Sequence, residues 1–323
     1  MLRSLPSRLL PRAFPSFPAP RSLPSFPPPL PPLSTSAARP LSSSPPPLTY
    51  FSSWFCPFAH RCTLALEHHE VPYEWVEALG WDTRAPSGDP SEDIPGSSRA
   101  EFHYHHKSPK LLACNPLGMI PTLLCPVTSR VATESLLCVE LADELALSRG
   151  SGAPPLLPGD PWDRAAARAA SEQVNKSVCS HYYGCLVLPD RASQLAAFSS
   201  LSAGLASFTK SLEGGAFYGG SGSLTSVDCA LLPYAFRLYV LEHYRGPEFR
   251  VGACGGEWAP EYEAWLQRAL ALPSVARTLP DKERYLAHVE KYASGRARSK
   301  VGNAVRRGRS AHEYDDDIDG EDK

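Results

Sequence analysis

The chain has 323 residues, a formal net charge of −2 and a pI of ≈ 6.6. This near-neutral balance gives no sign of a nucleic-acid-binding surface, and no apolar run reaches the roughly 20 residues that a membrane-spanning helix needs. The nine cysteines form no CxxC pair and no Cys/His cluster at zinc spacing. We therefore expect two domains with free thiols, no metal site, no nucleic-acid partner and no membrane span.

The two ends of the chain differ in composition from the middle. Residues 1–47 hold 15 of the 34 prolines, five arginines and no Asp or Glu. This composition is typical of a transit peptide for a plastid or mitochondrion; the alternative is a disordered Pro-rich tail on a cytoplasmic protein. Residues 295–323 join a basic run to the acidic stretch E-Y-D-D-D-I-D-G-E-D, which predicts a disordered tail.

Two blocks lie between these ends. Residues 48–147 mix short strands and helices, whereas residues 160–294 are rich in Ala and Leu at helical spacing. The link at 148–159 is rich in Gly and Pro, and neither a helix nor a sheet can absorb it. We therefore predict a domain boundary there.

The pattern of residues 48–147 predicts strands and helices in the following order. Residues 48–52 predict a strand, 57–70 a helix and 71–77 a second strand. The long polar stretch 80–106 predicts an inserted loop, and we interpret its H-Y-H-H run as polar loop rather than as a metal site. Residues 118–125 predict a strand with Pro121 inside it. The following helix would bury Leu136, Leu137, Val139, Leu141 and Leu145.

The second block contains one clear local signal. Thr225 and Asp228 have capping-box spacing before an apolar run, which predicts the start of a buried helix. Asp228 is therefore a stability residue rather than a catalyst. Tyr234 and Phe236 could reach a substrate pocket, but aromatic residues at such spacing are more often core.

The stretch W-F-C-P-F-A-H-R places Cys56 directly before Pro57, where a helix is expected to begin. A helix N-terminus presents unpaired N–H groups and a partial positive charge. A thiol at this point is stabilised as the thiolate, which is the reactive form. Residue 59 is Ala, so a resolving cysteine is absent and the partner thiol should come from a small molecule. The alternative is a buried structural cysteine.

Five segments, in order along residues 48–293, resemble the glutathione S-transferase superfamily, most closely its cysteine-containing omega-like group. They are F-C-P-F-A-H-R, N-P-L-G-M-I-P-T-L, E-S-L-L-C-V-E-L-A-D-E, L-L-P-G-D-P-W-D-R-A and S-L-T-S-V-D-C-A-L-L-P. The resemblance implies a thioredoxin-like α/β domain followed by an all-α domain, with the active cleft between them. It also implies a homodimer. The 80–106 insertion departs from the family's usual spacing.

The resemblance also implies roles for individual residues. Cys56 would be the catalytic nucleophile, with glutathione as co-substrate. A cis bond before Pro121 would turn the Ile120 backbone toward the cysteinyl part of glutathione. Glu134 and Ser135, at a helix start, would hold its γ-glutamyl end. Lys107, with Lys110 as the alternative, would bind its glycine carboxylate.

The predicted function is glutathione-dependent thiol transfer or reduction, with a small disulfide, a glutathionyl adduct or dehydroascorbate as the acceptor. Two alternatives remain. One is a transferase that conjugates glutathione to electrophiles; the other is a non-catalytic binding module on the same fold. An activated Cys56 argues against the module, which needs no reactive thiol.

Overall fold

The computed structural model describes residues 47–79, 107–254, 256–297 and 299–313, all within one compact unit. The predicted transit segment (except residue 47), the 80–106 insertion with its His-rich run, and the acidic end at 314–323 lie outside the described residues. None of the described helices is long and apolar enough to cross a membrane. Among the same residues, no cluster of His, Cys, Asp and Glu could hold a metal ion.

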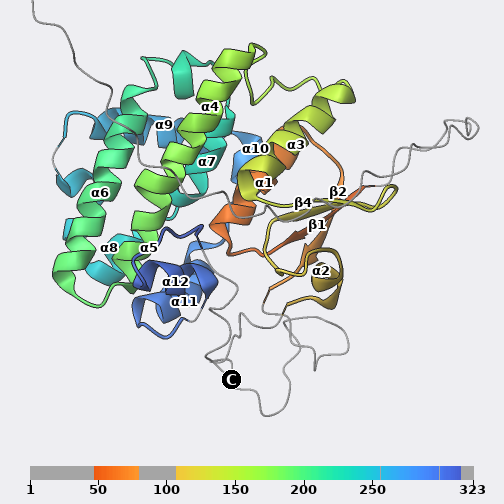
Figure 1. Ribbon diagram of the computed structural model, residues 1–323. Helices are drawn as coiled ribbons and strands as arrows, with labels where there is room; N and C mark the ends of the chain where they lie inside the picture. Colours follow the sequence, from red (N-terminus) through yellow and green to blue (C-terminus); the bar gives the residue numbers. More distant parts are fainter. Residues whose placement is uncertain (1–46, 80–106, 255, 298, 314–323) are drawn as a thin grey trace, which may run out of the picture. The chain divides into compact units, whose positions relative to one another are not determined.

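The first domain is a four-stranded mixed sheet with helices on both faces (Figure 1). The strand order is β2-β1-β3-β4; β1 runs parallel to β2 and antiparallel to β3, and β4 is antiparallel to β3. Its elements are β1 (Leu48–Ser52), α1 (Pro57–His68), β2 (Tyr73–Glu77), α2 (Pro109–Cys114), β3 (Thr122–Cys125), β4 (Arg130–Ala132) and α3 (Ser135–Ser148).

The predicted thioredoxin-like domain is confirmed, with shorter elements at prolines. β2 begins at Tyr73 rather than residue 71, because Pro72 has no N–H to donate to the sheet. β3 begins after Pro121, so this proline precedes the strand instead of lying inside it. The short elements α2 and β4 were not predicted.

The predicted buried face of α3 is confirmed for Val139, and Leu136, Leu141 and Leu145 pack partly buried against the core, but the prediction is wrong for Leu137. Cys138, Ala142 and Ala146 are buried at four-residue spacing, whereas the Leu137 side chain is 57% exposed. Small residues on this face allow α3 to approach α1 closely. Asp143, also buried there, accepts hydrogen bonds from the ring of His69 and from the N–H groups of Leu156 and Leu157. These bonds attach the linker to the first domain.

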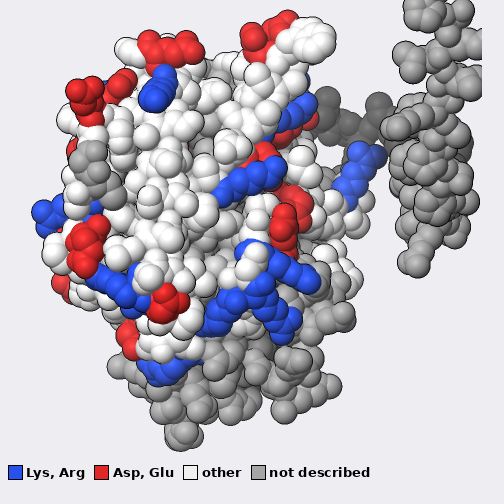
Figure 2. All heavy atoms as spheres, turned by 60° about the vertical axis from the view of Figure 1, so that its left-hand side comes forward, with Lys and Arg blue, Asp and Glu red and all other residues white. Residues whose placement is uncertain are grey.

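The second domain is all helical, as predicted. It consists of α4 (Pro161–Val174), a π-helical turn (Asn175–Cys179), α5 (Ser180–Val187), α6 (Arg191–Lys210), α7 (Ser226–Ala235), α8 (Tyr239–Arg245), α9 (Ala259–Ala271), α10 (Pro273–Ala276), α11 (Lys282–Ala293) and α12 (Lys300–Arg306), with 3₁₀ turns at Tyr218–Gly220, Pro247–Phe249 and Val251–Cys254. Charged side chains of both signs are interspersed over the face seen in Figure 2.

The core of the second domain is centred on α7. The capping box is formed as predicted: the Thr225 hydroxyl accepts from the Asp228 N–H, and the Asp228 carboxylate accepts from the Thr225 N–H. Tyr234, further along α7, is fully buried and belongs to the core.

The predicted disorder of the segment from residue 295 onward is wrong for its first part. Ser299 caps α12, in which Ala304 and Val305 are buried, and Ala311 beyond it is fully buried. Val301, Ala304 and Val305 have helical i, i+3, i+4 spacing. The basic residues on either side, Lys300, Arg306 and Arg307, obscured this pattern in the sequence.

Candidate active site

Cys56 is the N-cap residue of α1 and lies, partly exposed, in the wall of a cleft. Its backbone is extended (φ −76°, ψ 114°), and its Sγ accepts a hydrogen bond from the Ala59 N–H at 3.5 Å. Pro57 follows at the first helical position, where its missing N–H removes no helical bond. The sulfur therefore lies at the positive end of the α1 dipole.

The pKa of Cys56 is nevertheless raised, contrary to the expectation of a thiol held as thiolate. Burial is the largest cause and raises the pKa, while the N–H groups of Ala59 and Phe58 and the guanidinium groups of Arg237 and Arg61 lower it. The helix terminus acts in the expected direction, but loss of hydration penalises the charged form more strongly. The sequence predicted that Cys56 lies at a helix start, but it did not predict the side chains that exclude water from the thiol.

The two arginines that act on Cys56 are both fully buried, and neither meets a carboxylate among the described residues. Arg61 donates from Nη1 to the Ser135 Oγ at 3.1 Å and from Nη2 to the Cys179 Sγ at 2.9 Å. Arg237 donates from Nη1 to the His60 Nδ1 at 3.0 Å, and its Nε and Nη2 have no partner within the described chain. Because an unpaired buried charge is costly, both cations favour an anion at Cys56.

The Ile120–Pro121 bond is cis, as the resemblance implied. Asn115 supports this loop by donating from Nδ2 to the Met119 carbonyl at 3.1 Å and to the Thr122 hydroxyl at 2.9 Å. Ile120 is in the wall of the cleft that holds Cys56. Within the described residues its own N–H and C=O make no hydrogen bond, so both groups can pair with a bound ligand.

Lys107 lies in the same cleft wall, across the backbone of Gly118. Its Nζ donates to the Leu117 carbonyl at 3.3 Å. Gly118 has φ +60°, and a Cβ built there would lie 2.3 Å from the Lys107 Cδ. Glycine is therefore required both for the turn and for the path of the lysine. Lys110, the alternative, is an exposed residue on α2 that lines neither this cleft nor the next one described.

Glu134 and Ser135 form the start of α3. Glu134 has φ +67° and is the N-cap residue, but its exposed side chain makes no capping bond. In the described chain, the N–H groups of Ser135, Leu136 and Leu137 have no protein acceptor. A helix end of this kind is suited to bind a carboxylate.

These predicted residues are divided between two adjoining clefts. The Cys56 cleft, ≈ 100 Å³, contains Cys56, Lys107 and Ile120. The Ser135 cleft, ≈ 440 Å³, contains Ile120, Pro121, Glu134 and Ser135. Residues that line both clefts are Phe58, Met119, Ile120 and Val301. Ile120 therefore lies between the Cys56 thiol and the N-terminus of α3, in the wall of both clefts.

The remaining walls of the Cys56 cleft come from parts of the chain that the sequence did not implicate. They are aromatic and belong mainly to α5 and α11: Phe55, Phe58, Tyr182, Tyr183, Tyr285, His288 and Tyr292. The α11 members follow an i, i+3, i+7 pattern that would have identified one helical face, but nothing in it indicated which site the face lines. Phe236 lines a separate cavity, and Tyr234 lines neither cleft.

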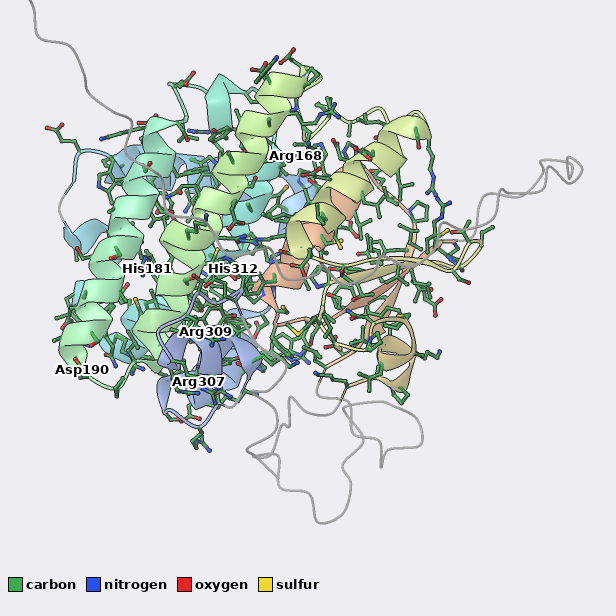
Figure 3. The ribbon with its side chains drawn as sticks, viewed as in Figure 1. Arg168, His181, Asp190, Arg307, Arg309 and His312 are labelled. Atoms are coloured by element: carbon green, nitrogen blue, oxygen red, sulfur yellow. The ribbon has the colours of Figure 1, made fainter. Side chains whose placement is uncertain are left out.

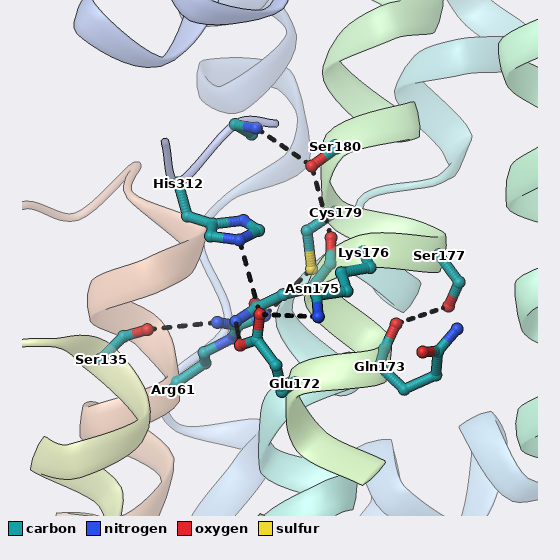
Figure 4. A network of polar contacts seen from close by, with 11 residues as sticks. Arg61, Ser135, Glu172, Gln173, Asn175, Lys176, Ser177, Cys179, Ser180 and His312 are labelled. Carbon is teal, nitrogen blue, oxygen red and sulfur yellow. Dashed lines mark hydrogen bonds and ion pairs between the residues drawn. The ribbon is translucent and has the colours of Figure 1, made fainter. Parts of the chain in front are cut away.

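A network of polar contacts connects the Ser135 cleft with the C-terminal part of the chain (Figure 4). Glu172 on α4 accepts from the Asn175 Nδ2 at 2.9 Å and pairs with the His312 Nε2 at 3.5 Å. Both Glu172 and His312 line the Ser135 cleft. His312 lies beside α4 and α5 in the side-chain view (Figure 3).

The first domain matches the family model "Glutathione S-transferase, N-terminal domain" over residues 55–145. The chain is 28% identical over 239 residues to the Nicotiana tabacum protein named "Probable glutathione S-transferase parC", covering 73% of this chain and 91% of the relative.

Two solved structures share the fold over both domains. Glutathione transferase Omega 3C from Trametes versicolor matches with a TM-score of 0.61 and 25% identity, over 79% of this chain and 94% of the other. Rice GST1 (OsGSTU1), solved in complex with glutathione, matches with a TM-score of 0.61 and 25% identity, over 79% of this chain and 100% of the other.

The relatives are mainly of the tau class, so the omega-like class expected from Cys56 is not confirmed. The superfamily itself is common to the family model, the relatives and the structures. The chain is therefore similar to glutathione S-transferases over both of its domains, and its residues 55–145 match the family model of their N-terminal domain.

Proposed function

We propose that this protein is a glutathione-dependent thiol transferase that uses Cys56 as its nucleophile. The observation that carries the proposal is a cysteine sulfur at the N-terminus of α1, in the wall of a cleft that the free backbone of Ile120 also lines. The solved complex of a related rice protein with glutathione supports glutathione as the co-substrate. The reaction class follows from the thiol, since a thiolate can itself form a mixed disulfide.

The proposed reaction has two exchange steps. In the first, the Cys56 thiolate attacks the glutathionyl sulfur of a mixed disulfide, the S–S bond breaks, and the other thiol leaves with the electron pair and takes up a proton. In the second, the thiolate of a free glutathione attacks the glutathionyl sulfur now bonded to Cys56. Oxidised glutathione leaves and the Cys56 thiolate is restored.

Each binding role follows from a group with unused hydrogen-bonding capacity or charge. The N–H and C=O of Ile120 would pair with the cysteinyl backbone of glutathione, as an added strand does. The free N–H groups at the start of α3, with the Ser135 hydroxyl, would bind the γ-glutamyl carboxylate. Glu134 would receive the α-ammonium group. Lys107 would attract the glycine carboxylate from the wall of the Cys56 cleft.

Ionisation of the Cys56 thiol gives this site its pH dependence. Attack requires the thiolate, and burial raises the pKa of Cys56. The first step should therefore speed up with pH between about 6 and about 9 as the thiol ionises. Arg237 and Arg61 lower the pKa of Cys56, but by less than burial raises it.

Conjugation of glutathione to electrophiles is the second candidate. It is favoured by the relatives, which are mainly of the tau class, and by the aromatic walls of the Cys56 cleft. In that reaction the glutathione thiol itself attacks, and the protein group beside it donates a hydrogen bond. A serine hydroxyl could do this as well as a thiol could.

The Cys56→Ser variant separates the two reactions. Both proteins are assayed for glutathione-dependent reduction of a small mixed disulfide and for conjugation of a chloronitrobenzene. Thiol transfer by the native protein only, with conjugation gained in the variant, supports the proposal. Thiol transfer that survives in Cys56→Ser excludes it. Inactivity of both proteins in both assays, with glutathione still bound, would favour a binding module.

We also propose that the protein is a homodimer and that residues 1–47 direct it to an organelle. Apolar side chains are exposed on neighbouring elements of the first and second domains: Val131 on β4, Leu137 on α3 and Trp162 on α4. A second copy covering them would bury this apolar surface. Light scattering on the purified protein tests the dimer, and a fluorescent fusion of residues 1–47 tests the location.

A further inference from the structure

The segment Ser299–Glu313, here called the C-terminal segment, is held against the second domain by several bonds. The Tyr292 hydroxyl donates to the Ser299 Oγ at 3.1 Å, and Arg306 donates from Nη1 to the Ala297 carbonyl at 2.7 Å. Further along, the Ala311 N–H donates to the Ser180 Oγ at 3.0 Å. Ala311 is fully buried at this contact. The segment is therefore anchored near both of its ends.

This segment forms part of the wall of both clefts. Ser299, Lys300 and Val301 line the Cys56 cleft, and Val301, Ala311 and His312 line the Ser135 cleft. Val301 belongs to both. The His312 ring pairs with Glu172 on α4 (Figure 4), so the far end of the segment is also held against the second domain.

The Cys56 cleft is small, so a side chain in its wall can limit which molecules enter it. The cleft measures ≈ 100 Å³, whereas pockets for drug-sized ligands measure about 300–1,000 Å³. The tyrosines of α5 and α11 in its wall, Tyr182, Tyr183, Tyr285 and Tyr292, are buried members of the main core. Lys107, Gly118, Met119 and Ile120 also line the cleft, from the first domain. Among the described residues, the C-terminal segment contributes Ser299, Lys300 and Val301 to the wall of this cleft, and Val301 is the only apolar one of the three.

We propose that the C-terminal segment sets acceptor specificity: Val301 limits the size of the molecule that reaches Cys56, and the Ala311–Ser180 contact holds this wall in place. The proposal rests on the thiol-transfer function for its biological meaning. It favours small disulfides as acceptors and excludes polycyclic aromatic ones. Val301 and Ser180 are thus positioning residues, since neither acts on the reacting sulfur atoms.

The test measures access to Cys56 without glutathione and without turnover. The protein is alkylated with iodoacetamide or with N-(1-pyrenyl)maleimide, and the rate at Cys56 is read from its peptide by mass spectrometry. Cys114 and Cys125, which are also partly exposed, are read in the same digest as internal references. The ratio of the small-reagent rate to the large-reagent rate measures the size filter.

Val301→Ala should lower this ratio at Cys56 by about tenfold, the low end of what a methylene-sized change does in a pocket. Val301→Phe should raise it, because a larger side chain narrows the cleft. Val127→Ala, at an exposed valine in the β3–β4 turn that lines neither cleft, should leave it unchanged. Ser180→Ala should shift the ratio in the same direction as Val301→Ala, by loosening the anchor.

Opposite shifts of the rate ratio in Val301→Ala and Val301→Phe would support the role of Val301 in limiting size. Mere loosening of α12 would shift the ratio in the same direction in both variants. An unchanged ratio in Val301→Ala and Ser180→Ala overturns the proposal, as does a shift of the same sign in both Val301 variants. Failure of the proposed function would look different. Thiol transfer would then be absent from the native protein, while the alkylation ratio would still respond to Val301.

Discussion

Replacing Asp228 with asparagine is expected to change how the stability of the protein depends on pH. Asp228 is fully buried at the start of α7, where it accepts from the Trp265 Nε1 at 2.8 Å and from the Thr225 N–H at 2.9 Å. Burial raises the pKa of this carboxyl to about 6, even though these hydrogen bonds lower it. The pKa of an unfolded aspartate is about 3.9.

The magnitude follows from this difference in pKa. About two pKa units at 1.36 kcal/mol each give about 3 kcal/mol. Because the folded pKa is the higher one, the contribution is fully present below about pH 3.9 and is lost as the pH rises through about 6. The native protein should therefore lose about 3 kcal/mol of unfolding free energy from this one group between about pH 4 and about pH 7.

Urea unfolding followed by tryptophan fluorescence, repeated across this pH range, measures the effect. Asparagine does not ionise, so the stability advantage of the native protein over Asp228→Asn should be largest at low pH and shrink by about 3 kcal/mol at neutral pH. Asp163→Asn, at an exposed position on α4, serves as the control and should show a constant difference. A constant or growing difference for Asp228→Asn would refute the assignment of its raised pKa to burial.

Three further outcomes concern the site. Arg237→Met should raise the pKa of Cys56, seen as a shift of the alkylation rate profile to higher pH, whereas Arg237→Lys should keep most of the native profile because the charge remains; identical profiles in all three proteins would remove Arg237 from the site. Gly118→Ala should weaken glutathione binding by about tenfold, since the new Cβ displaces Lys107 and an L-residue is strained at φ +60°; calorimetric titration with glutathione measures this, and unaltered affinity would exclude a role for Lys107. Thiol-transfer rates should rise between about pH 6 and about pH 9, and a rate that is flat across this range would contradict a protonated resting Cys56.

Local signals in the sequence were sufficient to predict the elements that carry Cys56 and Ser135. A proline after the cysteine, apolar spacing over one face and capping residues depend on neighbours within a few positions. The same holds for the Thr225–Asp228 capping box. These features survive in the structure because tertiary packing reinforces them.

Features that depend on distant contacts were not predictable in this way. The pKa of Cys56 depends on aromatic side chains from α5 and α11, which are more than 120 residues away in the chain. Arg237 acts on Cys56 from the residues that follow α7. The C-terminal segment was misread because its charge pattern is that of a solvated tail, whereas its few small apolar residues find a complementary surface on α5.

The covalent intermediate tests the central claim most directly. The native protein is mixed with the small mixed disulfide of glutathione and cysteine in the absence of free glutathione, quenched with acid, and digested without reductant. The account predicts one glutathione in disulfide linkage on the peptide that contains Cys56, lost again when free glutathione is added before the quench. An unmodified Cys56 peptide, or glutathione found only on other cysteines, would contradict the claim that Cys56 is the nucleophile.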